Sequence, residues 1–212
     1  MIDGNETLET EDRIALFDMD GTLCDYSGQL KRDLEKIRNP AEPEIEFQHD
    51  DSLLPAWYKQ RMHLIKSVPG WWKYLPRLED GFQVLDLAVS IGFTPEILTK
   101  GPFRSSQAWT EKYEWCRREI DGKGHSKKPI EIGITFNKGR VYGRMLVEDY
   151  PPYVEAWLKF RKRGFVVLMD RPYNRSLKHP QVERYDGTQA SLRIIVERTQ
   201  AAFDRKTLPS CE

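Results

Sequence analysis

The chain has 212 residues, of which 39% are hydrophobic, and its 33 basic and 33 acidic side chains give a formal net charge of zero. This length and composition exclude a disordered chain and predict one compact domain with a substantial insertion. The charge balance argues against a protein that coats duplex nucleic acid, although it does not exclude a local basic patch. The sequence contains no run of 18 apolar residues, so it predicts no membrane span.

The N-terminal residues and the cysteines indicate the compartment. Residues 1–12 are acidic and lack the apolar core of a secretory signal, so we expect a flexible leader there. The cysteines are odd in number and far apart, a pattern that favours neither a disulfide framework nor a metal site: Cys24, Cys116 and Cys211. We therefore expect a reducing, cytoplasmic location.

The first predicted strand is short and leads into a turn. Residues 13–17 form an apolar run, and Asp18-Met-Asp-Gly-Thr-Leu23 follows it directly. A short apolar run that is closed by Asp and Gly is typical of a buried strand that ends in a turn.

Residues 24–78 show no strand pattern and predict a helical insertion. Apolar residues first recur at helical spacing at Leu30, Leu34 and Ile37. After a breaker at Pro40-Ala-Glu-Pro43 the spacing is looser, with apolar residues at Leu54, Trp57, Leu64 and Val68. We expect this segment to be a small helical cap, inserted into a core that consists of residues 13–23 and 79–212.

Helices and strands alternate through the rest of the chain. Strands are expected at residues 93–98, 130–135, 144–147 and 165–169. The first helix of this part carries one apolar face and stops at a glycine: Leu78, Phe82, Leu85, Val89 and then Gly92.

Three further helices are expected between and after these strands. The first is capped by Ser105 or Ser106 and carries the stripe Trp109, Tyr113, Cys116 and Ile120. The second opens at Pro151 or Pro152, carries Tyr153, Trp157 and Phe160, and is closed by Gly164. The last carries Leu192, Ile195, Val196, Thr199 and Phe203.

The alternation predicts an α/β fold, namely a Rossmann-like parallel sheet with helices on both faces. In such sheets ligands bind outside the carboxyl ends of the strands. The residues that directly follow each strand are therefore the candidates for a functional site.

Polar side chains follow four of the predicted strands: Asp18 and Asp20, Thr99 and Lys100, Lys138, and Glu148 and Asp149. Proteins hold Mg²⁺ with one or two carboxylates together with phosphate oxygens and water. A hydroxyl and ammonium groups on neighbouring strands can bind the remaining phosphate oxygens. The set therefore predicts a site for a phosphate group and a metal ion.

The two aspartates after the first strand predict a catalytic pair. Asp18 can attack phosphorus as a carboxylate nucleophile, which gives an aspartyl-phosphate. Asp20 can protonate the leaving oxygen and later deprotonate the attacking water. Gly21 lets the backbone turn sharply beside them, while Mg²⁺ and Lys138 would neutralise charge on the transferring group.

These residues resemble the four motifs of the haloacid dehalogenase superfamily. Asp18-Met-Asp-Gly-Thr-Leu23 is similar to motif I, Thr99 to motif II, Lys138 to motif III and Glu148-Asp149 to motif IV. Order and spacing agree over residues 13–170. The resemblance implies the core fold of that superfamily, and the second Asp of motif I implies a phosphatase because the dehalogenase branch lacks this acid/base residue.

A closer resemblance is to the 5′(3′)-deoxyribonucleotidases. It is carried by Asp25-Tyr26, by Pro69-Gly70-Trp71-Trp72, by Glu111-Lys112-Tyr113-Glu114-Trp115 and by the ten-residue spacing from Lys138 to Glu148. The resemblance implies that Mg²⁺ is held by Asp18, by the backbone carbonyl of Asp20 and by Asp149. It also implies that Thr99 and Lys138 hold the phosphate and that Tyr26 lines the base pocket, with Trp71 and Trp72 as further candidate substrate contacts.

The chain departs from that family at three positions. Glu148 stands where the family has Asp, and it is either a further metal ligand or a surface acid beside Asp149. Lys100 replaces a Ser and adds a cation near the phosphate, which we expect to alter substrate preference. Lys66 falls near the place of an aromatic residue that helps to sandwich the base.

Some assignments keep an alternative. Lys127 and Lys128 compete with Lys138 for the motif III role, and the spacing to Glu148 favours Lys138. The hydroxyl of Thr99 could instead cap a helix or close a turn. The aromatic side chains of the insertion could be plain core of the cap instead of a base pocket: Tyr26, Trp71 and Trp72.

We expect a Mg²⁺-dependent phosphomonoester hydrolase, a 5′-nucleotidase-like phosphatase that acts on (deoxy)ribonucleoside monophosphates. One alternative is a phosphatase for another small phosphate ester or for a nucleic-acid end. The other is a catalytically silent binding protein on the same fold. The expected partner is a small-molecule phosphate monoester, not a membrane or a nucleic acid, and the resemblance suggests a homodimer.

Overall fold

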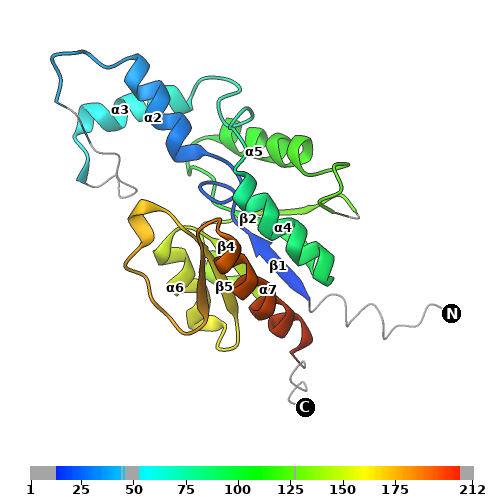
Figure 1. The fold of residues 1–212 in the computed structure, drawn as a ribbon. Coiled ribbons are helices and arrows are strands. Elements are labelled where there is room, and N and C mark those ends of the chain that lie inside the picture. The colour runs from blue at the N-terminus through cyan, green and yellow to red at the C-terminus, as the bar shows by residue number, and fades with distance from the viewer. Residues whose placement is uncertain (1–12, 44, 46–52, 127, 206–212) are drawn as a thin grey trace.

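A six-stranded parallel sheet forms the centre of the computed structural model, which describes residues 13–43, 45, 53–126 and 128–205 (Figure 1). The strand order is β3-β2-β1-β4-β5-β6, which is the order of a Rossmann-like sheet, so the predicted fold class is confirmed. The strands are β1 (Ile14–Phe17), β2 (Thr94–Thr99), β3 (Glu131–Ile134), β4 (Met145–Glu148), β5 (Phe165–Met169) and β6 (Val182–Tyr185). The leader expected at residues 1–12 lies outside the described residues.

Six helices accompany the sheet in the described part of the chain: α2 (Tyr26–Lys36), α3 (Ala56–Lys66), α4 (Glu79–Ile91), α5 (Ser106–Glu119), α6 (Pro151–Phe160) and α7 (Gln189–Asp204). Two short 3₁₀ helices, η2 (Lys138–Arg140) and η3 (Pro172–Asn174), follow β3 and β5. None of the described helices is both long and apolar enough to traverse a bilayer.

Local sequence explains where the helices begin and end. The Ser105 hydroxyl accepts a hydrogen bond from the backbone N–H of Ala108 and caps α5 as predicted. Proline stands at the start of α6, where its missing N–H has no helical partner to lose. Gly92 closes α4 with a φ of 116°, a left-handed conformation that favours glycine.

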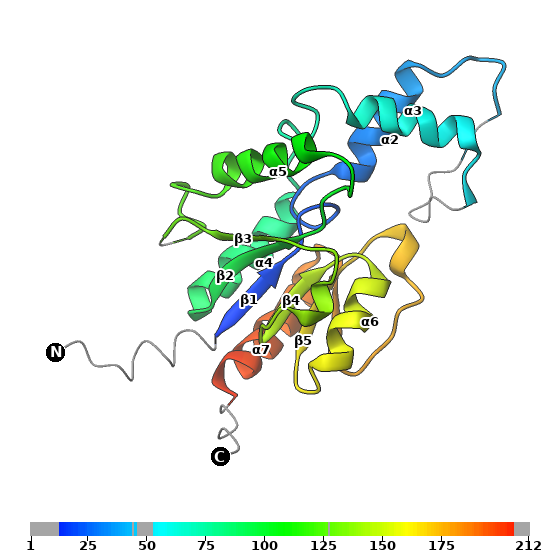
Figure 2. The same cartoon turned by 180° about the vertical axis from the view of Figure 1, so that it is seen from behind.

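Helices cover both faces of the sheet, as predicted. On one face, Ala15 and Phe17 of β1 pack in a cluster with buried side chains of α4, α5 and α7. On the other face, Leu16 packs with Trp157 and its neighbours in α6. Figure 1 shows α4 and α7 in front of the sheet, and Figure 2, seen from behind, shows α6 in front of it.

The position of β1 brings the predicted functional residues together. β1 lies between β2 and β4 and pairs in parallel with both. The carboxyl ends of these three strands therefore meet at one edge of the sheet. The backbone N–H of Asp18 extends this ladder by donating to the carbonyl of Val147 at 2.9 Å.

α2 and α3 stand together beyond this edge of the sheet (Figures 1 and 2). They share a small cluster of buried side chains, which is separate from the two clusters of the sheet and contains Leu30, Leu34, Leu54, Met62 and Ile65. This separate cluster supports the predicted cap at residues 24–78, whose boundaries stay a prediction.

The predictions of which residues form the buried face are wrong in part for several helices. In α3 the buried residues are Met62 and Ile65, while Leu64 and Val68 are exposed. In α5 the buried face consists of Ala108, Glu111, Lys112, Trp115 and Cys116, and the expected Tyr113 is exposed. Ile37, Phe160 and Val196 are likewise exposed. These faces are set by which side of each helix meets its neighbour, and short helices with aromatic residues on several sides fit more than one stripe.

The strand β6 was not predicted from the sequence. Its residues, Val-Glu-Arg-Tyr, contain two charges and lie at the edge of the sheet beside β5. Edge strands are exposed on one side and tolerate charged side chains, so this strand carries no apolar run that would identify it. The ion pair between Glu183 and Arg198 of α7, at 2.9 Å, accounts for one of these charges.

Candidate active site

A tight turn after β1 positions the first two acidic side chains. The backbone N–H groups of Leu23 and Cys24 both donate to the carbonyl of Met19, at 2.8 and 2.9 Å. Gly21 adopts a φ of +76° within this turn, and a Cβ there would collide with the carboxylate of Asp149. Only glycine meets both demands. The turn holds Asp18 at the strand end and Asp20 two residues further on.

Lys138 lies between two carboxylates at the carboxyl ends of β1 and β4. Its Nζ atom is 2.6 Å from Oδ1 of Asp18 and 2.7 Å from Oε2 of Glu148, and all three side chains are buried. The structure thus brings Lys138 to the predicted site, whereas Lys128 is exposed and Lys127 lies outside the described residues.

Burial and charged neighbours shift the pKa values of Asp18 and Lys138. Burial raises the pKa of Asp18, Lys138 counteracts this, and the nearby carboxylates of Asp149 and Asp20 raise it further. Burial alone would lower the pKa of Lys138, but its two carboxylate partners outweigh that effect and hold it above its ordinary value. Lys138 therefore stays protonated, and it lies beside Asp18, a carboxyl group whose pKa is raised by burial and by neighbouring carboxylates.

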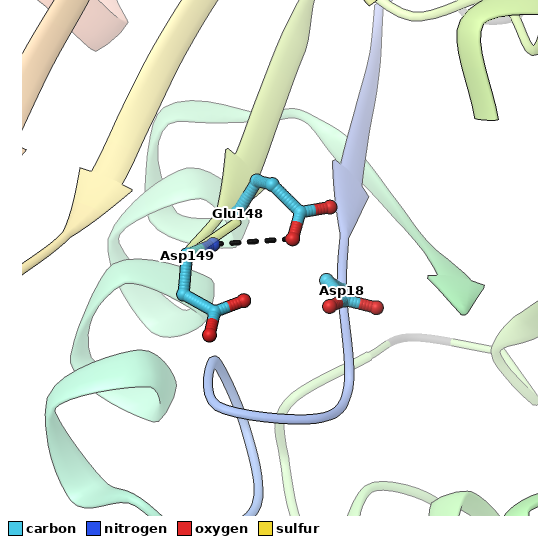
Figure 3. A group of neighbouring side chains, drawn as sticks. All are labelled: Asp18, Glu148 and Asp149. Carbon is cyan, nitrogen blue, oxygen red and sulfur yellow. Dashed lines mark hydrogen bonds between the residues drawn. The ribbon is translucent and has the colours of Figure 1, made fainter. Parts of the chain in front are cut away.

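Glu148 and Asp149 have different surroundings although they are adjacent in the chain. Both oxygens of Glu148 accept hydrogen bonds: Oε2 from Lys138, and Oε1 from the backbone N–H groups of Asp149 and Tyr150 at 3.2 Å each. The carboxylate of Asp149 contacts the phenol of Tyr173. Figure 3 shows Asp18, Glu148 and Asp149 gathered at the ends of their strands, with the bond from Asp149 to Glu148 dashed.

The charges at this edge of the sheet fit a divalent cation. Asp18, Glu148 and Asp149 can each offer one oxygen, and these oxygens lie within 4.8 Å of one another. Of these carboxylates, Asp18 and Glu148 pair with the ammonium of Lys138, while Arg171, which interacts electrostatically with Asp149, is bound to Asp80 at 2.9 Å. Buried carboxylates at this spacing are oxygen ligands of the kind that Mg²⁺ prefers, and a divalent ion would balance their excess charge.

Asp20 and Thr99 share a partner that the sequence analysis did not identify. Lys112 of α5 is fully buried, and its Nζ atom contacts Oδ2 of Asp20 and lies 3.0 Å from Oγ1 of Thr99. The sequence signal was present, because Lys112 lies one helical turn before Cys116 and one turn after Ala108. It was missed because lysine is rarely buried and the apolar stripe of α5 was placed on another face.

A cleft of about 440 Å³ opens onto these side chains. From the core it is lined by the predicted residues Asp18, Asp20, Lys100, Lys138 and Asp149. Two aromatic residues that the sequence analysis did not single out for this role, Tyr150 and Tyr153, line it as well. Lys100 lies over the ring of Tyr153, 5.7 Å from its centroid. The cleft thus combines charged side chains with aromatic surface.

The cap contributes Tyr26, Lys66 and Trp72 to the same cleft. The rings of Tyr26 and Trp72 stack with centroids 5.4 Å apart, and the ammonium of Lys66 donates to the Tyr26 hydroxyl at 3.2 Å. Trp71 does not belong to the lining. Its indole N–H donates to Asp33 at 3.0 Å, and its ring supports Tyr26 edge-on.

Two cysteines of the core are poor nucleophiles. Burial raises the pKa of the Cys24 thiol well above its ordinary value, and burial raises that of Cys116 to about 12. Since the thiolate is the reactive form, we expect a Cys211→Ser variant to resist a coloured disulfide reagent at neutral pH until it is unfolded in guanidinium chloride. One thiol that reacts rapidly in the folded variant would contradict this and reopen a role for Cys24 beside Asp20.

One sequence family and several solved structures are similar to this chain. A sequence model of the family described as 5′ nucleotidase, deoxy (pyrimidine), cytosolic type C protein matches residues 12–201. No curated protein gives a significant match. Among solved structures, a haloacid dehalogenase family hydrolase from Deinococcus radiodurans R1 with bound phosphate and sodium is 14% identical, with a TM-score of 0.48, covering 87% of this chain and 89% of that one. A haloacid dehalogenase-like hydrolase from Burkholderia xenovorans LB400 is 14% identical, with a TM-score of 0.46 and coverage of 82% and 92%.

Proposed function

We propose, from the premise that this chain belongs to the family of 5′ nucleotidase, deoxy (pyrimidine), cytosolic type C proteins, that it hydrolyses nucleoside monophosphates through an aspartyl-phosphate on Asp18. Membership makes the chain a phosphoric monoester hydrolase of the haloacid dehalogenase superfamily. The observation that carries the proposal is the convergence of Asp18, Lys138 and Asp149 on one cleft that also contains Asp20.

The reaction has two steps in this proposal. In the first, a carboxylate oxygen of Asp18 forms a bond to phosphorus while the bond from phosphorus to the ester oxygen breaks and Asp20 donates a proton to that oxygen. In the second, water attacks the phosphorus of the aspartyl-phosphate, Asp20 takes the proton of the water, and Asp18 and inorganic phosphate are released. The ammonium of Lys138 stays beside Asp18 and stabilises the charge on the transferring group.

We assign Mg²⁺ to the oxygens of Asp18 and Asp149, with the backbone carbonyl of Asp20 as the further ligand expected from the sequence. When bound, the ion supplies positive charge to the phosphate oxygens. Glu148 is less suited to ligation because both of its oxygens already accept hydrogen bonds. We assign to it the task of orienting Lys138.

The lining of the cleft supports a substrate with a phosphate at one end and a flat ring at the other. Thr99, Lys100 and Lys138 supply donors for phosphate oxygens near the strand ends. Tyr26 from the cap, and Tyr150 and Tyr153 from the core, supply aromatic surface in the same cleft. A nucleobase stacks well on such side chains, so a nucleoside monophosphate fits this distribution better than a sugar phosphate.

Replacing Tyr26 by Ala tests the base pocket. Stacking of a base on an aromatic ring is worth roughly 1–3 kcal/mol, so we expect KM for nucleoside monophosphates to rise about tenfold or more. The KM for ribose 5-phosphate, which carries no aromatic ring that could stack, should change less. Equal changes for both substrates would assign Tyr26 to the core of the cap instead.

A phosphate-release screen with and without Mg²⁺ tests the function itself. It should cover ribo- and deoxyribonucleoside monophosphates, sugar phosphates and 5′-phosphorylated oligonucleotides, with EDTA as the control. We expect release from nucleotides and its loss in EDTA. Release only from the other esters would support the proposed mechanism but contradict the proposed nucleotide substrate. No release from any ester would favour a silent binding protein.

The family description also supports a cytoplasmic location, which we propose together with the homodimer that the resemblance suggests. Light scattering of the purified chain tests the latter, and a mass of about twice the 24.9 kDa chain is the expected result.

A further inference from the structure

Lys112 is a buried cation whose contacts converge on the proposed acid/base. Its side chain has no exposed surface, and its Nζ atom is engaged on three sides. It contacts Oδ2 of Asp20, lies 3.0 Å from Oγ1 of Thr99, and lies 4.9 Å from the ring centroid of Trp72. An ammonium group has three donors and no acceptor; two of these donors serve Asp20 and Thr99, and the ammonium also lies over the ring of Trp72.

The helix that carries Lys112 is held firmly by its neighbours. The carboxylate of Glu111, the preceding residue, accepts hydrogen bonds from the backbone N–H groups of Gly70 at 2.7 Å and Trp72 at 3.1 Å. One turn later, the indole N–H of Trp115 donates to the carbonyl of Leu75 at 2.8 Å. α5 is thereby fixed to the segment that returns from the cap to the core, and the position of the Lys112 ammonium is fixed with it.

The contacts of Lys112 determine how Asp20 and Thr99 can act. Because Lys112 can only donate, Oγ1 of Thr99 is the acceptor in their bond, and the Thr99 hydroxyl keeps its own hydrogen for donation to a phosphate oxygen. The bond to Oδ2 of Asp20 likewise fixes the orientation of that carboxyl group. The other oxygen, Oδ1, is then the one left to exchange a proton with the substrate, with the Cys24 thiol 3.6 Å away as a weak donor.

We propose that Lys112 is a positioning residue for proton transfer by Asp20. The proposal rests on the function proposed above, in which Asp20 protonates the leaving oxygen. Lys112 does not touch the substrate in this proposal. It holds the Asp20 carboxyl group in the orientation from which the proton reaches the ester oxygen.

The identity of the leaving group separates this role from a structural one. An alkoxide, as in a nucleotide, leaves phosphorus poorly unless it is protonated, whereas p-nitrophenolate leaves without a proton. kcat/KM reports only the steps up to release of the first product, which are the steps in which Asp20 donates its proton. A residue that acts through Asp20 should therefore affect the two esters unequally.

The test measures kcat/KM for thymidine 5′-monophosphate and for p-nitrophenyl phosphate with Mg²⁺ present. General acid catalysis contributes roughly 10²–10⁴-fold, so we expect Asp20→Asn to lose that factor on the nucleotide and far less on the nitrophenyl ester. Lys112→Met should show the same imbalance with a loss of about 10²-fold on the nucleotide. In the double variant the two losses should not multiply, because both act on one proton transfer.

Tyr113→Ala is the matched control, since it removes the exposed neighbour of Lys112 on α5 and leaves the bonds of Glu111, Lys112 and Trp115 in place. We expect it to alter both esters by the same factor. If Lys112→Met fails to fold, Lys112→Gln keeps a donor at the site and serves in the same comparison, with an intermediate imbalance as the expected result.

The outcomes separate the inference from the proposed function. No hydrolysis of either ester by the wild type would overturn the proposed function. Equal losses on both esters in Asp20→Asn would remove Asp20 from the acid/base role. If Asp20→Asn shows the imbalance but Lys112→Met affects both esters equally, or if the losses multiply in the double variant, Lys112 is structural and the inference is wrong.

Discussion

Asp18→Asn is expected to lower kcat by about 10⁴-fold or more, the scale observed when a catalytic nucleophile or its direct partner is removed. The asparagine amide cannot form the bond to phosphorus that the carboxylate forms. Single-turnover measurement with ³²P-labelled nucleotide should trap a phosphorylated protein from the wild type and none from the variant. Retention of more than about one-hundredth of the wild-type kcat would contradict the assignment of Asp18 as nucleophile.

The same variant is expected to stay folded. Asn has nearly the same shape as Asp, and it removes one of several crowded carboxylates whose pKa is raised by burial. A carboxyl group with a raised folded-state pKa favours the folded state below its unfolded pKa and loses that contribution as the pH rises through its folded pKa. Above the ordinary value of 3.8, the charged Asp18 therefore weakens the fold in the absence of metal, and Asn relieves this.

Urea unfolding with and without Mg²⁺ checks this expectation. Without the ion, the variant should be at least as stable as the wild type at neutral pH. Added Mg²⁺ should stabilise the wild type more than the variant, because a ligand stabilises the state that binds it. Equal stabilisation of both proteins would place the ion elsewhere. A variant that is unfolded would void the kinetic comparison and require Asp18→Glu in its place.

Lys138→Met is expected to have the largest effect on stability. It removes the one cation that lies between the buried carboxylates of Asp18 and Glu148. Breaking a buried ion pair from one side typically costs about 3–5 kcal/mol, because the remaining charge is left without a partner. Turnover should also fall by at least about 10²-fold, since the cation that stabilises the transferring group is lost.

The loss should depend on pH with a definite sign. Burial raises the pKa of Glu148, the charge of Asp18 raises it further, and Lys138 is the cation that opposes both. In Lys138→Met the pKa of Glu148 should rise further still. The stability deficit should therefore grow as the pH rises through the folded-state pKa of Glu148, which burial holds well above its ordinary value of 4.5, and shrink when acid protonates both carboxyl groups.

Lys128→Met is the matched control because Lys128 is exposed and was the rival for the same role in the sequence. Its free energy of unfolding should stay within about 0.5 kcal/mol of the wild type at every pH. Denaturant titrations of both variants between pH 4 and pH 8 in EDTA measure the difference. A pH-independent deficit in Lys138→Met would mean that packing, and not unpaired charge, accounts for its loss.

The sequence alone was sufficient for five of the six described strands and for grouping the residues that follow them. Apolar runs such as residues 13–17 and 165–169 identify buried strands because both faces of a parallel sheet are covered. In a parallel sheet the residues that follow neighbouring strands come together automatically, so Asp18, Thr99 and Asp149 could be grouped before any coordinates were known. These conclusions needed only local pattern and order along the chain.

Tertiary structure decided everything that depends on which surfaces meet. Lys112 and Tyr173 reach the site from α5 and from the residues after β5, and no spacing in the chain relates them to Asp20 or Asp149. We propose separate tasks for Glu148 and Asp149 because different donors surround each carboxylate, although the two residues are adjacent in the sequence. The edge strand β6 and the buried faces of α3 and α5 were missed for the same reason. A side chain is buried, paired or aimed at a cleft by contacts with distant segments, and those contacts exist only once the chain has folded.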